Sequence, residues 1–484
     1  MSMSRTFDYL VCFSVYSLII LIIGKSSFGE SDSIGKFFIG ERKCGFWRLF
    51  STFVGTWVSA ATILGYTGNV FENGTSVIAV TVIPWFIGAG LLYLISGRIY
   101  DCDLLTIPQF IGERYHSRFL RTCCALLLSG GYVFYLVIQI KGFGIAAATL
   151  LNIDYKVAIF LVYLFILYST FGGFNSVTKT DGGNLIMLTI SIVVVYFVVV
   201  GGIEGSGFLT NAEVFSRNAA GSGTDSFGNL MKDYSLTMYL TMFFGWGMGL
   251  AANPQYLIRI VAAKSRETAR KVLICSLVFL TFFYFCLTQI GLGLRILFPY
   301  LSYYFGSDDI FVYAINYLLR SRFSGFFLIS VIGACMSTAN SQLLLIGSMM
   351  SYDVAAQYGK WKKTEDRILG LTQLFIFLGG TLALLLSLNP PSNSLFFGAD
   401  IWGLFSAILT PLLYGTLYYK RATRTGAWAA FGTGVTGTVL LQPRELPVYW
   451  GFPVTLCSTL VFVLAPVLES IWKNVLAKGG HLET

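Results

Sequence analysis

The stretch GFFLISVIGACMSTANSQLLLIGSMMSYD, residues 325–353, decides how the rest of the sequence is interpreted. It is long and apolar enough to cross a bilayer as a helix, for which roughly 20 residues suffice. Its centre nevertheless carries a block of polar residues, namely Ser337, Thr338, Asn340, Ser341 and Gln342. Because polar groups in hydrocarbon need partners, this block is expected to face the interior of a helical bundle.

Two hydroxyls of this block are predicted to lie beside one backbone carbonyl. On a helix, the side chains of Ser337 and Thr338 lean back toward the carbonyl of Ala334, three and four residues earlier. One carbonyl and two hydroxyls without a full charge are the kind of oxygen ligands that a hard cation prefers. The alternative is that both hydroxyls only bond to carbonyls one turn earlier in their own helix.

The composition is that of a polytopic membrane protein. The 484 residues are 55% hydrophobic and 12% charged, with a mean hydropathy of +0.70, whereas soluble domains carry about 25% charged residues. The apolar runs predict 13 spans, at residues 9–24, 49–68, 76–98, 122–149, 156–174, 183–203, 235–258, 269–298, 323–352, 368–388, 396–419, 426–442 and 448–472. The first run has no small-residue cleavage site and is interpreted as a retained helix rather than a signal peptide. The nine cysteines follow no disulfide or metal-ligand spacing.

Positive charge is distributed unevenly between the two sides of this predicted topology. Twenty-four Lys and Arg residues fall in loops or span ends on one side. Eight fall on the other side: Arg5, Lys156, Arg217, Lys232, Arg295, Arg320, Arg322 and Arg444. Because cytoplasmic loops carry an excess of Lys and Arg, we expect the N-terminus outside and the C-terminus in the cytoplasm. The net charge of +9 is then explained by the excess of Lys and Arg on the cytoplasmic side of the membrane, and no nucleic-acid partner is expected.

Two of the predicted spans are interrupted by small residues. The span at 49–68 contains Gly55, Gly65 and Gly68, and the span at 235–258 contains Gly245, Gly247, Gly249, Asn253 and Pro254. Two such spans, five apart, are typical of inverted-repeat transporters, in which unwound backbone near the membrane midplane holds the ion and the solute. The repeats would be residues 49–203 and 235–419, with an extra helix at 9–24 and two C-terminal helices at 426–472. The chain contains no Walker A motif, so ATP-driven transport is not expected.

Four stretches of the chain resemble one known family. They are LYSTFGGFNSVTKTDGGN (167–184), GWGMGLAANPQ (245–255), MSTANSQLL (336–344) and Asn389, Pro390 and Pro391. In this order they are similar to the motifs of the sodium:solute symporters, which include transporters of proline, pantothenate, sialic acid and galactose. The resemblance covers essentially the whole chain. It implies an all-α transmembrane domain with the five-plus-five inverted repeat of the bacterial leucine transporter.

The resemblance also implies a sodium site between the span at 49–68 and the span at 323–352. Carried over by position, its ligands are the carbonyls of Gly55, Val58 and Ala334 and the hydroxyls of Ser337 and Thr338. Some relatives bind a second sodium ion, and the corresponding residues here are Asp181, Ser337, Asn340 and Ser341. Asn340 stands where relatives carry a hydroxyl, and its amide oxygen could replace that ligand. The alternative for Asp181 is an ion pair with Lys179 or a cap at the start of its span.

The solute pocket implied by the resemblance lies beside the same interrupted spans. By position it is lined by Trp57, Ser59, Trp246, Leu250 and Pro254. The proline transporter has a carboxylate in place of Trp57 and a tyrosine in place of Leu250, which argues against proline as the solute. An aromatic residue at the Trp57 position also occurs in the pantothenate branch.

Lys141 is the one basic residue that falls neither in a loop nor at the end of a span. It lies about 30 Å along the helix from Arg121, in the outer part of the membrane. One interpretation is that its ammonium extends to the outer headgroups. The other is that it faces the outer vestibule, where it attracts an anionic solute or pairs with a carboxylate, for which Asp400 is the candidate.

The sequence therefore predicts sodium-coupled symport of a small organic solute, such as an organic anion or carboxylate, across the plasma or inner cell membrane. The alternatives are a transporter-like sensor or receptor without turnover, and a membrane-embedded enzyme. The predicted sodium site argues against the sensor. The spans carry no pair of carboxylates, and His116 and His481 lie in a loop and the C-terminal tail, which argues against the enzyme. Sodium is the only ion expected and no cofactor is expected; a monomer is expected, with an oligomer as the alternative.

Overall fold

The computed structural model describes residues 3–27, 33–203, 234–318, 323–359, 364–441 and 451–479. Several basic residues that entered the charge count lie outside these ranges: Arg217, Lys232, Arg320, Arg322, Lys360, Lys362, Lys363 and Arg444. The regular secondary structure of the described residues is helical, apart from one isolated bridge between Cys44 and Ala263, and these residues form no strand.

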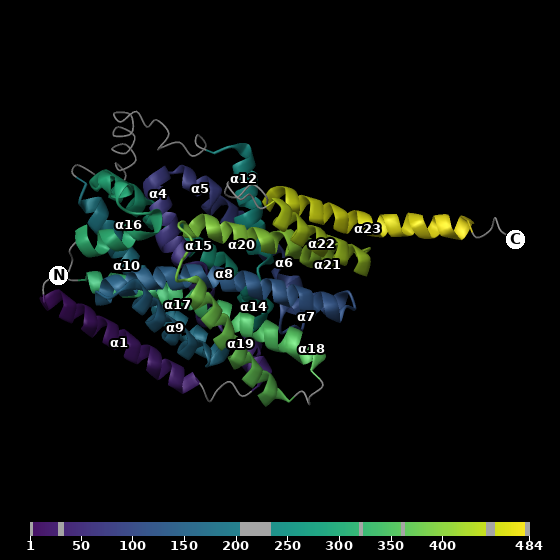
Figure 1. Ribbon diagram of the computed structural model, residues 1–484, viewed down its shortest axis with the longest axis horizontal. Coiled ribbons are helices and arrows are strands. Elements are labelled where there is room, and N and C mark those ends of the chain that lie inside the picture. Colours follow the sequence, from purple (N-terminus) through teal and green to yellow (C-terminus); the bar gives the residue numbers. More distant parts are fainter. Residues whose placement is uncertain are drawn as a thin grey trace.

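The described residues up to Gly201 form ten helices (Figure 1). They are α1 (Met3–Ser27), α2 (Ile34–Ile39), α3 (Phe46–Trp57), α4 (Thr67–Asn73), α5 (Ser76–Val80), α6 (Val82–Asp101), α7 (Ile107–Arg114), α8 (Arg118–Leu151), α9 (Tyr155–Thr170) and α10 (Gly173–Gly201). A π-helical turn, Ala61–Tyr66, lies between α3 and α4, and a 3-10 turn, Gly40–Arg42, follows α2.

The second half contains more interruptions. Its helices are α12 (Leu236–Met242), α13 (Gly249–Ala252), α14 (Pro254–Ala262), α15 (Arg266–Leu297), α16 (Ser307–Tyr313), α17 (Ser324–Ser348), α18 (Ala356–Tyr358), α19 (Glu365–Leu386), α20 (Ser394–Leu409), α21 (Gly415–Tyr418), α22 (Arg424–Leu441) and α23 (Gly451–Gly479). Segments of π-helix occupy Phe243–Met248, Ala314–Leu318, Met349–Ala355 and Thr410–Tyr414, and a 3-10 turn occupies Pro299–Tyr303.

Among the described residues, eight helical segments are long and apolar enough to cross a membrane. The number is nine if the bent pair Phe46–Trp57 and Ala61–Asn73 counts as one span. The predicted number of 13 spans is therefore not confirmed. The difference arises where the helices are short or interrupted. The predicted span at 235–258, for example, is divided among α12, a π-helical segment, α13 and α14.

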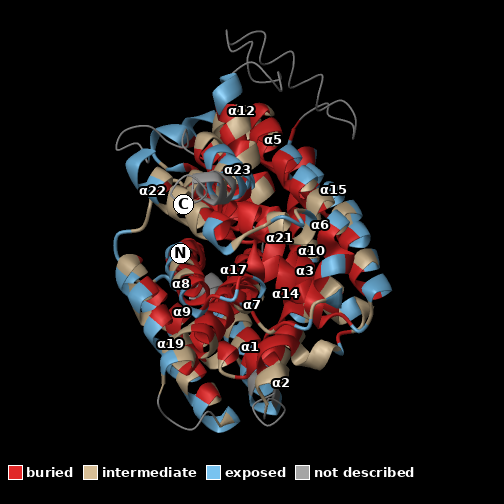
Figure 2. Cartoon of the chain, turned by 90° about the vertical axis from the view of Figure 1, so that its right-hand side faces the viewer, coloured by how far each residue is buried: buried red, intermediate tan, exposed pale blue. Residues whose placement is uncertain are grey.

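The polar stretch at residues 325–353 forms most of α17, which lies at the centre of the bundle. Every residue of α17 except Phe326 is buried, and the helix packs against α8 and α10 (Figure 2). Its polar block is buried as well, with Ser337 and Thr338 both at 0% exposure. The prediction that this block faces the protein interior is confirmed. The outer helices differ, since α19 and α23 carry exposed leucines, as expected of surfaces that face lipid.

Both predicted interruptions are confirmed, and each has a local cause. The chain bends by 53° between Phe46–Trp57 and Ala61–Asn73, where Val58 leaves the helical region with φ −79° and ψ 100°. In the other interrupted span, Asn253 is extended because the ring of Pro254 disfavours the helical conformation of the preceding residue. The side chain of Asn253 then caps α14 by accepting a hydrogen bond from the backbone N–H of Gln255 at 3.1 Å.

Candidate ion and solute site

The hydroxyl of Thr338 lies among three backbone carbonyls where α3 ends against the middle of α17. Its Oγ1 is 3.4 Å from the carbonyl oxygen of Gly55, 3.3 Å from that of Thr56 and 3.5 Å from that of Ala334. The structure thus brings together three of the residues predicted to bind sodium, and adds the carbonyl of Thr56. All four groups are fully buried.

Ser337 and Val58 complete the predicted set of residues. A Cβ atom added to Gly55 would lie only 2.8 Å from Ser337 Oγ, so the serine hydroxyl packs directly against the α3 backbone. A larger residue at position 55 would displace it. The extended backbone at Val58 turns its carbonyl out of the α3 hydrogen-bond ladder, which leaves this oxygen available for another partner.

The residues predicted for a second ion contact other protein groups. Asp181 accepts a hydrogen bond from Thr52 Oγ1 at 2.5 Å. The amide oxygen of Asn340 instead accepts hydrogen bonds from Ser169 at 2.7 Å and Thr170 at 3.1 Å, both on the last turn of α9. In this arrangement the amide oxygen of Asn340 bonds to α9, and its role as a ligand in place of a hydroxyl stays a prediction.

Ser341, the remaining residue predicted for the second ion, contacts a positively charged side chain. The guanidinium of Arg259 on α14 donates a hydrogen bond to Ser341 Oγ at 2.6 Å. It also donates to the carbonyls of Thr52 at 3.1 Å and Gln255 at 2.6 Å. Arg259 follows the predicted span at 235–258 and was expected in a cytoplasmic loop, yet the side chain is buried in the bundle. Its setting within the apolar run PQYLIRIVAA was the signal that could have revealed this.

Two of the residues predicted to line the solute pocket belong to a closed circle of six buried aromatic side chains, which we call the aromatic cluster. Its members are Trp57 (α3), Tyr256 (α14), Trp402 (α20), Trp246 (the π-helical segment after α12), Trp85 (α6) and Tyr284 (α15). In this order, the successive ring centroids are 5.7, 5.8, 4.8, 4.8 and 5.4 Å apart. Tyr284 closes the circle, because its hydroxyl oxygen accepts a hydrogen bond from Trp57 Nε1 at 3.1 Å.

The other predicted pocket residues lie next to the same interruptions. Ser59 follows the bend after α3, and Leu250 and Pro254 lie on α13 and at the start of α14. All three are buried. Trp85, Tyr256, Tyr284 and Trp402 were not identified from the sequence, since aromatic residues on membrane helices are usually packing residues and carry no distinctive spacing.

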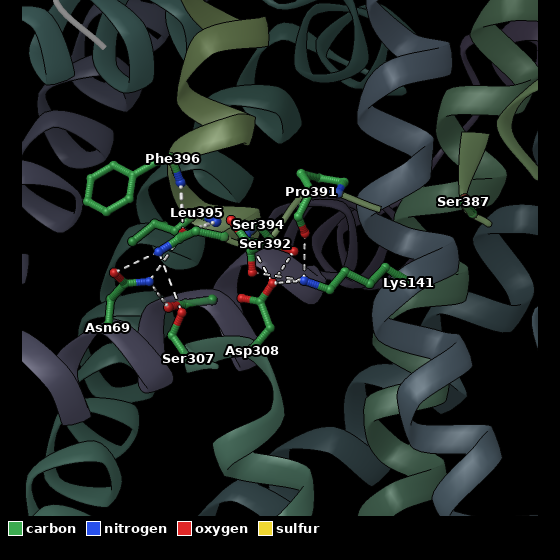
Figure 3. Close-up of polar contacts among 12 residues, drawn as sticks. Asn69, Lys141, Ser307, Asp308, Ser387, Pro391, Ser392, Ser394, Leu395 and Phe396 are labelled. Carbon is green, nitrogen blue, oxygen red and sulfur yellow. Dashed lines mark hydrogen bonds and ion pairs between the residues drawn. The ribbon is translucent and has the colours of Figure 1, made fainter. Parts of the chain in front are cut away.

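Lys141 does not pair with Asp400, and it does not extend to the headgroups. Its ammonium lies 2.5 Å from Asp308 Oδ2 on α16 (Figure 3). It also donates hydrogen bonds to the carbonyl oxygens of Pro391 at 2.8 Å and Ser392 at 3.1 Å. The predicted partner was therefore wrong, although a carboxylate partner exists. Because three acceptors match the three N–H groups of the ammonium, Lys141 has no remaining donor for an anionic solute.

The carboxylate of Asp308 also forms hydrogen bonds with the start of α20 (Figure 3). Asp308 Oδ2 accepts hydrogen bonds from the backbone N–H and the hydroxyl of Ser394, at 3.0 and 2.6 Å. Next to it, Asn393 donates to Asn69 Oδ1 on α4 at 3.1 Å. These contacts join α4, α8, α16 and the loop before α20 at one end of the bundle.

A second buried ion pair lies at the opposite end of α8. Arg121 Nε donates to Asp353 Oδ1 at 2.6 Å, and Thr106 Oγ1 donates to the same oxygen at 2.9 Å. The guanidinium also lies over the ring of Tyr352, 4.8 Å from its centroid. Arg121 was expected as a charge at the end of the span at 122–149, whereas the structure buries it against Asp353.

Comparisons with known proteins give one consistent result. The sequence model of the sodium:solute symporter family matches residues 37–434. The osmoregulated proline transporter OpuE of Bacillus subtilis is 25% identical over 494 residues, which cover 98% of this chain and 96% of that protein. A sodium/proline symporter of Staphylococcus aureus is 25% identical over 441 residues, or 88% of this chain and 84% of that protein.

The fold agrees with these relatives. The solved structure of a substrate-bound, outward-open Na⁺-coupled sialic acid symporter superimposes with a TM-score of 0.79 at 16% sequence identity. The match covers 95% of this chain and 98% of that one. The family match over most of the length, with the broken helices and the central polar helix in their expected places, shows that the chain belongs to the sodium:solute symporter family.

Proposed function

We propose that the protein couples the entry of one sodium ion to the uptake of a small organic solute across the cell membrane. The observation that carries the proposal is the position of the Thr338 hydroxyl, 3.3–3.5 Å from three carbonyl oxygens. Ordinary hydrogen bonds from hydroxyls to carbonyls one turn earlier are shorter in this protein, at 2.7 Å for Thr170 and 2.8 Å for Thr372. The longer distances argue against simple back-bonding and favour oxygens arranged around a cation.

The proposed sodium ligands are the carbonyl oxygens of Gly55, Val58 and Ala334 and the hydroxyls of Ser337 and Thr338. These groups are neutral, and they come from the bend after α3 and from the centre of α17. A site divided between two elements is suited to coupling, because the ion stabilises the arrangement that brings the elements together.

The contacts of Asn340 and Ser341 support one sodium ion per cycle rather than two. The amide oxygen of the first and the hydroxyl of the second already have protein partners. A membrane potential of ~100 mV contributes about 2.3 kcal/mol per charge. A tenfold sodium gradient adds about 1.4 kcal/mol. One sodium ion therefore sustains roughly a few hundredfold accumulation of a neutral solute.

The proposed topology is the five-plus-five inverted repeat, with residues 49–203 and 235–419 as the repeats, the N-terminus outside and the C-terminus in the cytoplasm. The solute is proposed to bind beside the two broken helices, where Trp57, Ser59, Trp246, Leu250 and Pro254 are buried. An anionic solute held by Lys141 is not retained, because Asp308 neutralises the ammonium.

The test is sodium binding by the purified protein, measured as the rise in thermal unfolding temperature when NaCl replaces KCl. A ligand that binds only the folded state raises this temperature. We expect a sodium-specific shift that saturates, together with sodium-dependent uptake of at least one solute from a labelled panel in proteoliposomes. Equal unfolding temperatures in the two salts would overturn the proposal.

A further inference from the structure

The composition of the aromatic cluster points to a class of solute, an inference that rests on the proposed transport function. Its six side chains come from six different elements and include residues of both broken helices. All six are at most 3% exposed. None of them carries a charge at neutral pH, so the cluster offers π faces, indole N–H groups and tyrosine hydroxyls.

The two buried basic groups described above, Lys141 and Arg259, already have protein partners. The ammonium of Lys141 is paired with Asp308. The guanidinium of Arg259 donates to Ser341 and two carbonyls. A solute carboxylate therefore has no uncommitted cation to pair with among these groups. A solute cation, in contrast, is stabilised by the negative faces of tryptophan and tyrosine rings without any carboxylate.

Three donors of the cluster lack partners. The indole N–H groups of Trp85, Trp246 and Trp402 are buried and have no hydrogen-bond partner among the described residues. Trp57 differs, since its indole donates to Tyr284. Buried donors are normally satisfied, because an unmade hydrogen bond costs the full desolvation of the group. Three adjacent unsatisfied indoles are thus poorly explained by core packing alone, and a solute oxygen would satisfy them.

The scarcity of hydrogen-bond acceptors in the aromatic cluster indicates which type of ammonium it binds. A primary ammonium brings three N–H groups that need acceptors once water is removed. Indoles are donors only, so the six side chains supply just two acceptor atoms, the hydroxyl oxygens of Tyr256 and Tyr284, and the latter already accepts from Trp57. A fully alkylated ammonium has no N–H groups, and its methyl groups pack against aromatic faces.

We propose that the aromatic cluster recognises a small solute that combines a quaternary ammonium with an oxygen acceptor, as in choline or trimethylglycine. The ammonium packs against the faces of Trp246 and its neighbours, and the oxygen accepts hydrogen bonds from the unpartnered indoles. Trp85, Tyr256, Tyr284 and Trp402 then determine specificity together with Trp57 and Trp246.

The first experiment compares each cation with an isostere in which carbon replaces the nitrogen. Binding of choline and 3,3-dimethylbutanol, and of trimethylglycine and 3,3-dimethylbutanoate, is measured on the full-length protein in saturating NaCl. We expect at least one of the two cations to bind ~10-fold or more tightly than its isostere, because shape is kept and only the charge is lost. Equal affinities within both pairs, or no binding of either cation, would overturn the proposal.

The second experiment uses variants within and outside the cluster. Trp246→Leu is expected to weaken cation binding ~10-fold or more, and Trp246→Phe to weaken it less, because the phenyl ring retains a π face. Trp47→Leu is the matched control, since Trp47 lies on α3 with 77% exposure and outside the cluster. Should Trp246→Leu fail to fold, Trp402→Leu replaces it. Unchanged cation affinity in the folded variant would contradict the proposal.

The sodium-specific thermal shift distinguishes a wrong solute class from a wrong transport function. If the wild-type protein shows the sodium-specific thermal shift but does not discriminate cations from isosteres, only the solute class is wrong. If the thermal shift is absent, the proposed transport function itself fails.

Discussion

Lys141 and Asp308, 167 residues apart in the sequence, form a buried ion pair with an Nζ–Oδ2 distance of 2.5 Å. The pair connects the long helix α8 to the short helix α16, and the lysine reaches the loop before α20 through two carbonyls. A single side chain thus holds three segments of the chain together at one end of the bundle.

We expect Lys141→Gln to lower the stability of the protein rather than its affinity for solute. Removing one member of a buried ion pair leaves an uncompensated charge, which typically costs about 3–5 kcal/mol. The double variant Lys141→Gln with Asp308→Asn is expected to recover part of the loss, because no charge is left unpaired. Thermal unfolding of the purified variants measures this, with Lys156→Gln as an exposed control. A double variant no more stable than the single one would show that the charge is not the cause.

Thr338→Val is expected to weaken sodium binding by ~10-fold or more, because the bound ion loses one of few oxygen ligands and valine keeps the shape. Ser330→Ala is the matched control on α17, since the Ser330 hydroxyl only bonds to the Phe327 carbonyl at 2.7 Å. Sodium titrations of the thermal shift give both affinities. A wild-type response in Thr338→Val would remove this residue from the site.

The contacts of Asn340 predict a sodium dependence with a Hill coefficient of about 1. Asn340→Ala removes two hydrogen bonds to α9 and is expected to reduce stability by ~1–3 kcal/mol. It should leave the shape of the sodium curve unchanged. A wild-type Hill coefficient near 2 that falls in the variant would instead restore Asn340 as a ligand of a second ion.

The proposed orientation is tested by labelling single cysteines in a variant that lacks the nine native ones. Tyr304, with 76% exposure, is the labelling position near the predicted outer loop that precedes α16. We expect cysteines at Asn73 and Tyr304 to react with an impermeant reagent from outside. Cysteines at Arg118 and Lys264 should react only after permeabilisation. The opposite pattern at two of these positions would reverse the topology.

The sequence predicted the features that arise from local chemistry. The buried polar block of α17, the bend after Trp57 and the break at Asn253 follow from hydroxyls in an apolar helix, from small residues and from a proline. Thr338 could be placed beside Ala334 because helical geometry alone brings residues four apart into contact.

The missed features depend on contacts between distant parts of the chain. No residue near Lys141 in the sequence indicates that Asp308 is its partner, because α16 is a short helix outside the predicted spans. The aromatic cluster combines six elements, each contributing one ring, so no segment shows a periodic signal. Arg259 was misplaced because a charge near a predicted span end is normally solvated, and only tertiary packing shows that it is buried.

The two buried ion pairs of α8 also have an electrical consequence. Arg121 and Lys141 are 20 residues apart, or ~30 Å along the helix, and each is matched by one carboxylate. A neutral pair carries no net charge through the membrane field when its helix moves. At ~100 mV, where each charge crossing the membrane is worth about 2.3 kcal/mol, these groups therefore add almost nothing to the transport current. Under the proposed coupling, the cargo itself contributes one elementary charge for sodium with a zwitterion, and two for sodium with a choline-type cation.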